Sequence, residues 1–507
     1  MKTQKIGSAL LTGIMALSMV PAMGGNVLAA SDIAVNSTNF PDKNFRTCVS
    51  TSFDTNKSGT LSADEIKKAK YLSCYDKQIS SLKGVEYLTA LTSLSAGSNN
   101  ITSVDLTKNV NLESLNLSDN KIKSINLTKN VKLKSINLSE NTIKALDLSK
   151  NTKLETLHAY SNKLSGISLP KGSTLKKIDL DTNLFTAFNT SNLTGLESLS
   201  LQSNKLSSIT LNNKYLKTVD LFKNANLAKI DVSKCPALEY LELGGTKISA
   251  INVKGNKYLK ALGLSGTKIS SIDVTANSQL EILYVDQTNI KSLNVTKNTY
   301  LTALNAHDIA ISSLDLSKNK NLRYLNIRGT KIERVNIADC ADLVALYKKG
   351  PTYSGTYSIT YDGKINGKYC DIYISVGTQL VISKPTKTPS KACVAFVERM
   401  YTTALKRKAE TAGRDYWAEQ LCTHKMSGEL VGACFFMSDE MISYKLSNDE
   451  FVNRLYATFM DRKPDADGKK YWVQFLKDGH NRLEVVMGFT RSPEFIAKCE
   501  AAGILPY

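Results

Sequence analysis

The chain has 507 residues, nine cysteines and a formal net charge of +19. Residues 391–507 hold 17 Lys+Arg against 16 Asp+Glu, so the basic excess belongs to the part before residue 391. After the first 30 residues, no apolar run approaches the roughly 20 residues that a membrane-spanning helix needs, which excludes a membrane-embedded protein. Few aromatic residues accompany the lysines, so nucleic acid is not an expected partner.

The first 30 residues predict a secretory signal peptide. Lys2 and Lys5 precede an apolar run from Ile6 to Val20, and small residues lead to Ala29 and Ala30. A basic start, a short apolar core and a small-residue cleavage site are its three parts. We therefore expect a secreted, extracellular monomer with no transmembrane segment after signal removal, held at the cell surface without a covalent anchor.

Residues 31–68 predict a small helical N-cap that contains one loop of special composition. Six residues match the ligand positions 1, 3, 5, 7, 9 and 12 of an EF-hand calcium loop, with Gly59 at position 6. They are Asp54, Asn56, Ser58, Thr60, Ser62 and Glu65. Only two of them are charged, so we expect calcium to be a weak structural cofactor, with a Kd on the order of 10⁻⁴–10⁻³ M. The alternative is a helix–turn–helix in which Ser62 and Glu65 form a capping box.

Residues 69–342 contain a unit of about 21 residues that recurs some thirteen times. After a degenerate first unit at Ala69, the units start at Leu91, Leu112, Leu133, Leu154, Leu175, Leu196, Leu216, Leu238, Leu259, Leu280, Leu301 and Leu322. In each unit a Leu-x-x-Leu-x-Leu pattern predicts a short strand. A following asparagine, replaced by threonine from Thr246 onward, is expected to bond backbone groups at the turn.

This unit resembles that of bacterial secreted leucine-rich repeat proteins, the class that includes internalin-like surface proteins. The resemblance implies a solenoid in which each unit buries its apolar face against its neighbours. The predicted fold class is therefore an α+β multidomain protein: a leucine-rich repeat solenoid with a parallel β-ladder, a helical N-cap, a β C-cap and an all-α C-terminal domain.

Lysines recur at two repeat positions and allow two interpretations. One set is Lys121, Lys163, Lys205, Lys247, Lys268 and Lys331, and the other is Lys108, Lys129, Lys150, Lys297 and Lys318. Such ladders would attract an anionic cell-wall polymer. Alternatively, they keep a long β-surface soluble.

The resemblance also implies a concave strand face, on which the later repeats carry a candidate ligand-binding patch. Its members are Tyr240, Glu242, Ile282, Tyr284, Asp286, His307, Tyr324 and Arg328. Tyrosine and arginine beside carboxylates are typical of binding hot spots. The alternative is that tyrosine simply suits strands.

The cysteines divide by position. Cys235 and Cys340 occupy a slot that asparagine fills in other repeats, so we expect them to be buried and reduced. Cys48 and Cys74 are candidates for a staple in the N-cap. The sequence positions of the remaining cysteines do not predict which of them form disulfides.

Residues 343–383 predict a β C-cap with a hairpin turn at Asp362 and Gly363. Residues 384–391 form a proline-containing linker. Residues 392–507 are duplicated: Phe396, Arg399, Tyr401 and Trp417 recur 55 residues later as Phe451, Arg454, Tyr456 and Trp472. These residues resemble a bacterial helical family of unknown function, catalogued under the number four-two-one-four. The resemblance transfers no chemistry.

No catalytic constellation is recognised, because the four histidines lack metal-ligand spacing and no nucleophile or phosphate-loop motif is present. We expect a non-catalytic binding or adhesion protein that recognises protein or glycan on a cell surface through the concave repeat face. Two alternatives are a structural envelope protein that holds anionic wall polymer, and an enzyme whose site lies in the C-terminal domain.

Overall fold

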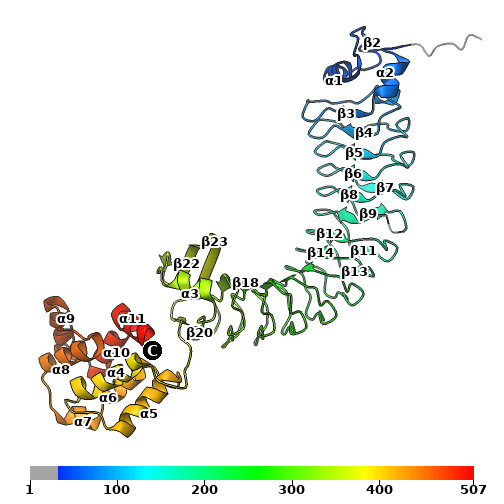
Figure 1. Cartoon of the computed structure of the whole chain (residues 1–507). Coiled ribbons are helices and arrows are strands. Elements are labelled where there is room, and N and C mark those ends of the chain that lie inside the picture. Colours follow the sequence, from blue (N-terminus) through cyan, green and yellow to red (C-terminus); the bar gives the residue numbers. More distant parts are fainter. Residues whose placement is uncertain (1–31, 173) are drawn as a thin grey trace, which may run out of the picture.

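The computed structural model describes residues 32–172 and 174–507, and the predicted signal peptide lies outside them. The repeats form a curved solenoid with a helical cap at the N-terminal end, a β cap at the other end and a separate helical domain beyond it (Figure 1). One apolar core runs from Phe40 to Leu380, and a second core lies within the helical domain.

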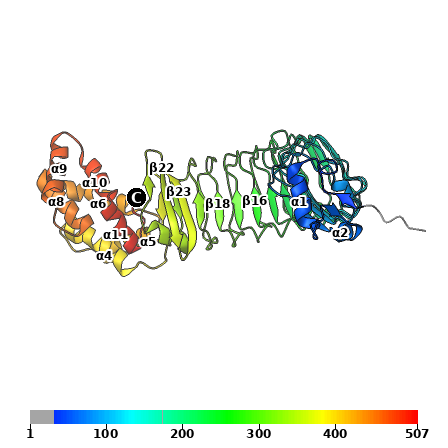
Figure 2. The same ribbon diagram turned by 90° about the horizontal axis from the view of Figure 1, so that it is seen from above.

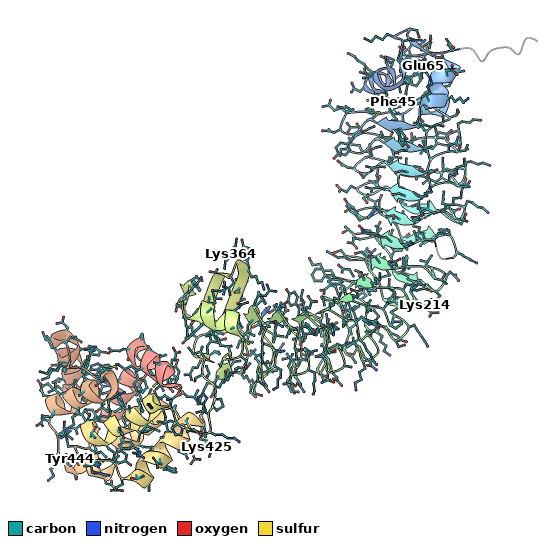
Figure 3. All side chains as sticks on the ribbon, in the orientation of Figure 1. Phe45, Glu65, Lys214, Lys364, Lys425 and Tyr444 are labelled. Carbon is teal, nitrogen blue, oxygen red and sulfur yellow. The ribbon has the colours of Figure 1, made fainter. Side chains whose placement is uncertain are left out.

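The N-cap contains two helices and a small two-stranded antiparallel sheet. α1 (Lys43–Phe53) begins at Asp42, whose side chain accepts hydrogen bonds from the backbone N–H groups of Asn44 and Phe45. β1 (Ile33–Ala34) pairs with β2 (Thr60–Leu61), and α2 (Ala63–Lys68) follows. Buried Phe45 and Val49 on α1 close the end of the apolar spine. In Figure 3 Phe45 and Glu65 both lie at this end of the stack.

The solenoid has thirteen parallel three-residue strands, one in each predicted unit, which enclose twelve turns. They are β3 (Tyr71–Ser73), β4 (Ser93–Ser95), β5 (Ser114–Asn116), β6 (Ser135–Asn137), β8 (Thr156–His158), β10 (Lys177–Asp179), β12 (Ser198–Ser200), β14 (Thr218–Asp220), β15 (Tyr240–Glu242), β16 (Ala261–Gly263), β17 (Ile282–Tyr284), β18 (Ala303–Asn305) and β19 (Tyr324–Asn326). A short 3₁₀ turn, η1 (Val85–Tyr87), precedes β4. The middle residue of every strand is buried and its neighbours face outward, as the strand period of two requires.

Short strand pairs also form on the opposite side of the coils. β7 (Ala145–Asp147) pairs with β9 (Gly166–Ser168), and β11 (Ala187–Asn189) pairs with β13 (Ser208–Thr210). Figure 1 shows these pairs on the outer side of the bend and the long ladder on its inner side, so the ladder lines the concave face. Figure 2 shows the ladder continuing into the β cap.

Two buried asparagine ladders hold successive coils together. In the first ladder, Asn120 accepts from the backbone N–H of Ile101 at 2.9 Å and donates to the carbonyl of Ala96 at 3.0 Å, so its amide spans two coils. In the second ladder, Asn130 donates to the carbonyls of Leu106 and Asn109. Cys235 and Cys340 are buried, reduced members of this second slot, as expected.

Threonine replaces the first asparagine in the later coils, and its contacts are fewer. The hydroxyls of Thr246, Thr267 and Thr288 each donate to a carbonyl three residues earlier, within their own coil. The side-chain bond from one coil to the next is therefore absent at these three positions.

The β cap extends the ladder instead of only covering its end. After β20 (Arg334–Asn336) and α3 (Ala341–Tyr347), the chain forms β21 (Tyr353–Ser354), β22 (Ser358–Ile365), β23 (Lys368–Ser375) and β24 (Gln379–Val381). β23 pairs in parallel with β19, which makes it a fourteenth rung. The predicted turn at Asp362 and Gly363 is wrong, since both residues lie inside β22. The turn is at Asn366 and Gly367, which both have positive φ as a type I′ turn requires.

The C-terminal domain is all-α over residues 391–507. Its helices are α4 (Lys391–Arg399), α5 (Thr411–Cys422), α6 (Gly428–Phe436), α7 (Asp439–Ser443), α8 (Asn448–Leu455), α9 (Ala466–Lys477), α10 (Arg482–Thr490) and α11 (Pro493–Ala502), with π-helical turns η2 (Met400–Ala404) and η3 (Tyr456–Met460). The duplication is visible in the contacts: Arg407 bonds Glu440 and lies over Tyr401, while Arg462 bonds Glu494 and lies over Tyr456. Each copy therefore fixes the loop after its π-turn in the same way.

Candidate functional site on the concave strand face

The concave strand face presents three side chains from each coil. They are the first and third residues of the strand and the residue two positions further along. All eight predicted patch residues occupy such positions on β15, β17, β18 and β19 or just after these strands. The register of the ladder therefore brings together residues that lie up to 88 positions apart, from Tyr240 to Arg328.

The tyrosines of the later coils form a continuous aromatic row with the cap. The ring centroids of Tyr284 and Tyr324 are 6.4 Å apart, and those of Tyr324 and Tyr373 are 5.8 Å apart. The guanidinium of Arg328 lies 5.4 Å from the centre of the Tyr373 ring. We call Tyr240, Tyr284, Tyr324, Tyr373 and Arg328 the tyrosine patch. Tyr373 could not be placed in it from the sequence, because the 343–383 segment lacks the repeat pattern.

The tyrosine patch is half-buried and rigid. Tyr240 is 37% exposed, and burial raises its pKa to about 12, with the neighbouring carboxylates Glu242 and Asp220 adding to the shift. Burial likewise raises the pKa of Tyr284 and that of Tyr324. These phenols therefore stay neutral at physiological pH and offer hydroxyl donors above a flat aromatic surface.

A row of carboxylates runs along the middle of the same face. We call Asp179, Asp181, Asp220, Glu242 and Asp286 the acidic stripe. Burial raises the pKa of Asp181, and its acidic neighbours Asp179 and Asp220 raise it further. Burial also raises the pKa of Asp220 and that of Glu242, again with acidic neighbours adding to the shift. Burial is the main cause of the raised pKa in each case, and the nearby like charges are a smaller one.

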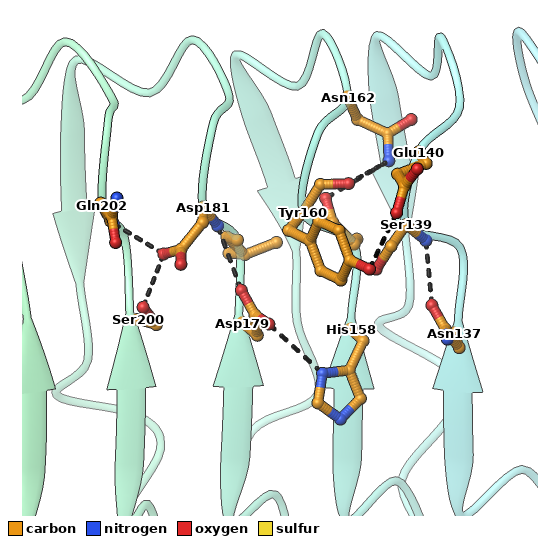
Figure 4. Close-up of polar contacts among 12 residues, drawn as sticks. Asn137, Ser139, Glu140, His158, Tyr160, Asn162, Asp179, Asp181, Ser200 and Gln202 are labelled. Carbon is orange, nitrogen blue, oxygen red and sulfur yellow. Dashed lines mark hydrogen bonds and ion pairs between the residues drawn. The ribbon is translucent and has the colours of Figure 1, made fainter. Parts of the chain in front are cut away.

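Local hydrogen bonds hold the first half of the stripe in place (Figure 4). Asp181 accepts from the hydroxyl of Ser200 at 2.6 Å and from the backbone N–H of Gln202 at 2.7 Å. Asp179 lies 3.4 Å from Nδ1 of His158. On the neighbouring coils, Tyr160 donates to Glu140 at 3.0 Å. The sequence prediction overlooked Asp179, Asp181, Asp220 and His158, although listing the same repeat positions through every coil would have found them.

From β5 to β17, the position just before each strand of the long ladder carries charges that alternate in sign. Its members are Glu113, Lys134, Glu155, Lys176, Glu197, Lys217, Glu239, Lys260 and Glu281. Lys134 contacts Glu113 at 2.7 Å, Lys217 contacts Glu197 at 3.5 Å, and Lys260 contacts Glu239 at 2.8 Å. This alternating ladder neutralises itself along one edge of the strand face, and its exposed pairs add little stability.

The loop predicted to bind calcium is held by hydrogen bonds among its own residues. Asp54 and Asn56 each accept from the backbone N–H of Ser58, and Asp54 also accepts from Gly59, so the first positions of the loop lie close together. Glu65 accepts four hydrogen bonds, from the N–H and hydroxyl groups of Thr55 and of Ser62. The capping box predicted for Ser62 and Glu65 is therefore formed. Calcium ligation by Glu65 would have to replace some of these bonds.

The rest of the described chain was searched for metal sites, membrane-spanning helices and grooves. Within 32–172 and 174–507, no three His, Cys, Asp or Glu side chains gather so as to hold a metal ion. No helix in these ranges is long and apolar enough to cross a membrane. In the helical domain, a groove of about 780 Å³ lies between the two copies, lined by Thr403, Lys406 and Asn453 among others.

Known protein families match both the repeat region and the C-terminal domain of the chain. A leucine-rich repeat family model matches residues 108–124, and a domain of unknown function (DUF4214) matches residues 387–444 and 432–499. Internalin J of Listeria monocytogenes serotype 4b is 37% identical over 70 residues, which are 14% of this chain and only 8% of that protein.

Solved structures extend the likeness over the solenoid. The functional domain of internalin J from Listeria monocytogenes aligns with a TM-score of 0.51 and 23% identity, covering 69% of this chain and 99% of that one. An internalin (inlF) from the same species aligns with a TM-score of 0.47 and 22% identity, covering 62% of this chain and 89% of that one. The chain therefore has a leucine-rich repeat fold similar to that of the internalins, followed by segments that match a domain of unknown function (DUF4214).

Proposed function

We propose that the chain is exported and acts as a non-catalytic adhesion protein, which binds a protein partner on a cell surface through its concave strand face. The observation that carries this proposal is the tyrosine patch, in which aromatic rings from β17, β19 and β23 form one continuous half-buried row. Rigid aromatic side chains beside an arginine are the groups that most often dominate binding energy. Their loss typically costs at least about 2 kcal/mol for each hot-spot residue.

Binding should therefore depend on Tyr284 and Tyr324 and not on tyrosines elsewhere. The test replaces both by alanine in the full mature chain and measures attachment of the purified protein to cells that bind the unmodified protein. We expect attachment to fall at least about thirtyfold, which corresponds to about 2 kcal/mol. A thermal melt verifies that the variant is folded.

Tyr258 and Tyr300 provide a matched control. They are 65% and 54% exposed, and each lies in a turn before the strand, away from the concave face. Their double replacement removes the same chemistry from the solenoid and should leave attachment unchanged. Equal attachment of both double variants would reject the tyrosine patch as the binding surface.

A second candidate function, retention of anionic wall polymer, is favoured by the exposure of the lysine ladders. All eleven ladder lysines are exposed. This function predicts binding to isolated cell wall that weakens steeply with salt, and that persists when Tyr284 and Tyr324 are replaced. Salt-resistant wall binding would reject it.

A further inference from the structure

The charge of the concave strand face is opposite to that of the whole chain. The chain carries +19, yet from β8 to β17 the three outward positions of each coil hold the five carboxylates of the acidic stripe and a single lysine, Lys177. The lysines of the two ladders lie at other repeat positions, and Figure 3 shows Lys214 on the outer side of the bend. The excess positive charge of the chain therefore lies mainly outside this acidic part of the concave strand face.

Little positive charge balances the acidic stripe within the described residues. Lys177 is the single lysine on this stretch of the face, and three of the four lysines of the neighbouring alternating ladder contact glutamates of the same ladder, as in the contact of Lys260 with Glu239. The raised pKa values of Asp181, Asp220 and Glu242 are consistent with this lack of counter-charge. A cationic group placed over these carboxylates would relieve their mutual repulsion.

Two of the carboxylates are held in place with an oxygen still available. Asp286 is only 6% exposed, and its Oδ1 accepts from the hydroxyl of Ser265 at 2.6 Å. Its Oδ2 accepts no hydrogen bond from the described residues, and Nδ1 of His307 lies 3.7 Å away. Glu242 accepts from the backbone N–H of Gly244 at 2.7 Å and rests against Gly263, where an added Cβ would lie 1.8 Å from Oε2. The missing side chain at residue 263 makes room for this carboxylate.

The spacing of the stripe indicates the kind of ligand. From β10 to β17 the ladder advances by five strands, which is about 24 Å at the usual strand separation. An extended peptide of about seven residues covers that length. The carboxylates are too dispersed for one metal ion, since no metal-holding group of His, Cys, Asp or Glu occurs in the described ranges. A row of separated carboxylates is electrostatically complementary to a ligand whose basic groups are spaced along its length.

We propose that the partner presents an extended, arginine- or lysine-rich segment, which lies across the coils with its basic side chains on Asp179, Asp181, Asp220, Glu242 and Asp286. This inference rests on the proposed function and names the chemistry of the partner. The tyrosine patch continues the surface beyond β17, so a segment bound here has aromatic rings at one end and carboxylates along its length.

The test uses the full mature chain and a labelled heptapeptide of alternating arginine and alanine, with fluorescence anisotropy as readout. The variant D220N/E242Q keeps the side-chain shapes and removes two charges, and it should bind the peptide at least about tenfold more weakly with a shallower salt dependence. The control E197Q/E239Q removes two charges from the alternating ladder and should bind as the unmodified protein does. Thermal melts of all variants verify the fold.

Other results would overturn the inference. These are equal binding of a glutamate–alanine heptapeptide, equal loss in the control variant, and full competition by spermine or calcium at the peptide's own concentration. Attachment to cells separates the two proposals. If Tyr284 and Tyr324 are required for attachment but D220N/E242Q attaches normally, the basic-segment inference fails and the proposed function stands. If D220N/E242Q weakens peptide binding and attachment but the tyrosine variants attach normally, the tyrosine patch fails and the basic-segment inference stands.

Discussion

The hydroxyl of Tyr347 on α3 donates to Oε1 of Glu500 on α11 at 2.8 Å, which joins the end of the solenoid to the helical domain. Burial raises the pKa of Glu500, and it also raises that of Tyr347. The ring of Tyr361 is tilted against that of Tyr347, with the ring centroids 5.5 Å apart, so the contact is part of an aromatic junction. The solenoid and the helical domain are therefore joined by a specific side-chain contact as well as by the linker at residues 384–391.

Removal of this contact should loosen the helical domain from the solenoid. We expect Glu500→Ala to increase the radius of gyration measured by small-angle scattering and to speed proteolysis within residues 384–390. Asp467→Ala, an exposed acidic residue of α9, is the control and should change neither. An unchanged radius in Glu500→Ala would mean that the contact does not hold the domains together.

The same junction should depend on pH in a defined direction. The pKa of Glu500 is higher in the folded junction than in a separated chain, so the protonated acid is favoured when the domains are docked. Docking is therefore strongest below the ordinary pKa of glutamate and weakens as the pH rises through the raised value. Scattering between pH 4 and pH 7 should show an increasing radius, and Glu500→Gln should remove the dependence.

The first asparagine ladder should contribute strongly to stability. Asn141 is 7% exposed, accepts from the N–H of Ile122 and donates to the carbonyl of Leu117, so alanine would leave buried backbone groups unpaired. We expect Asn141→Ala to lower the free energy of unfolding by about 1–3 kcal/mol, measured by urea titration. Asn141→Thr should cost less, because threonine fills this slot in later coils and still donates within its own coil.

Asn111→Ala is the control for this measurement. Its amide donates to the carbonyl of Thr89 at an exposed site, where water can replace the lost bond. Its effect should lie within about 0.5 kcal/mol. An equally small effect for Asn141→Ala would show that the buried ladder is not needed for stability.

The local parts of this fold were predictable, and the long-range parts were not. The leucine pattern located all thirteen strands because each one is specified within a single coil. The capping box at Ser62 depends on residues three positions apart, and it formed as the alternative interpretation of the loop predicted. β23 pairs with β19 at a separation of 47 residues, and the segment from residue 343 lacks the repeat pattern, so no local signal predicts this pairing.

In the candidate site too, local features were predictable from the sequence and contacts between coils were not. Tyr284 and Tyr324 were predicted because both follow from counting positions within known repeats. Asp179, Asp220 and Glu242 also occupy repeat positions that can be counted, but they lie 41 and 22 residues apart in the chain. The register of β10, β12, β14 and β15 shows that they form one row. The room that Gly263 gives to Glu242 is a contact between coils, and the sequence of one coil does not contain it.

If the chain is exported, as proposed above, a disulfide between Cys48 and Cys74 is expected. Both thiols are free in this structure, but they are near enough for a side-chain hydrogen bond, and burial is the main cause of the raised pKa of Cys74. Oxidation would close a loop of about 25 residues and stabilise the cap by about 3 kcal/mol. Peptide mapping without reductant should find this pair. Cys48→Ser should lower the cap's melting temperature only under oxidising conditions, whereas Cys434→Ser, at an exposed position, should not.

The N-cap loop should lose stability in acid and gain it from calcium. Hydrogen bonds from Ser62, followed by those from Thr55, lower the pKa of Glu65 to about 2. Because the folded pKa is depressed, this stabilisation is present above the ordinary glutamate pKa and is lost as the pH falls toward 2. Glu65→Gln should abolish that acid dependence, which a melt of the cap followed by hydrogen exchange would detect.

Calcium binding is tested separately from this acid effect. If Asp54, Asn56, Ser58 and Thr60 bind the ion, millimolar calcium should raise the melting temperature of the cap, and Asp54→Asn should remove that rise. Asp76→Asn, at an exposed turn of the first coil, is the control and should keep it. Since Glu65 already closes the loop through Thr55 and Ser62, the folded loop itself does not require the ion. A melting temperature indifferent to both calcium and chelator would leave the capping box as the sole role of Glu65.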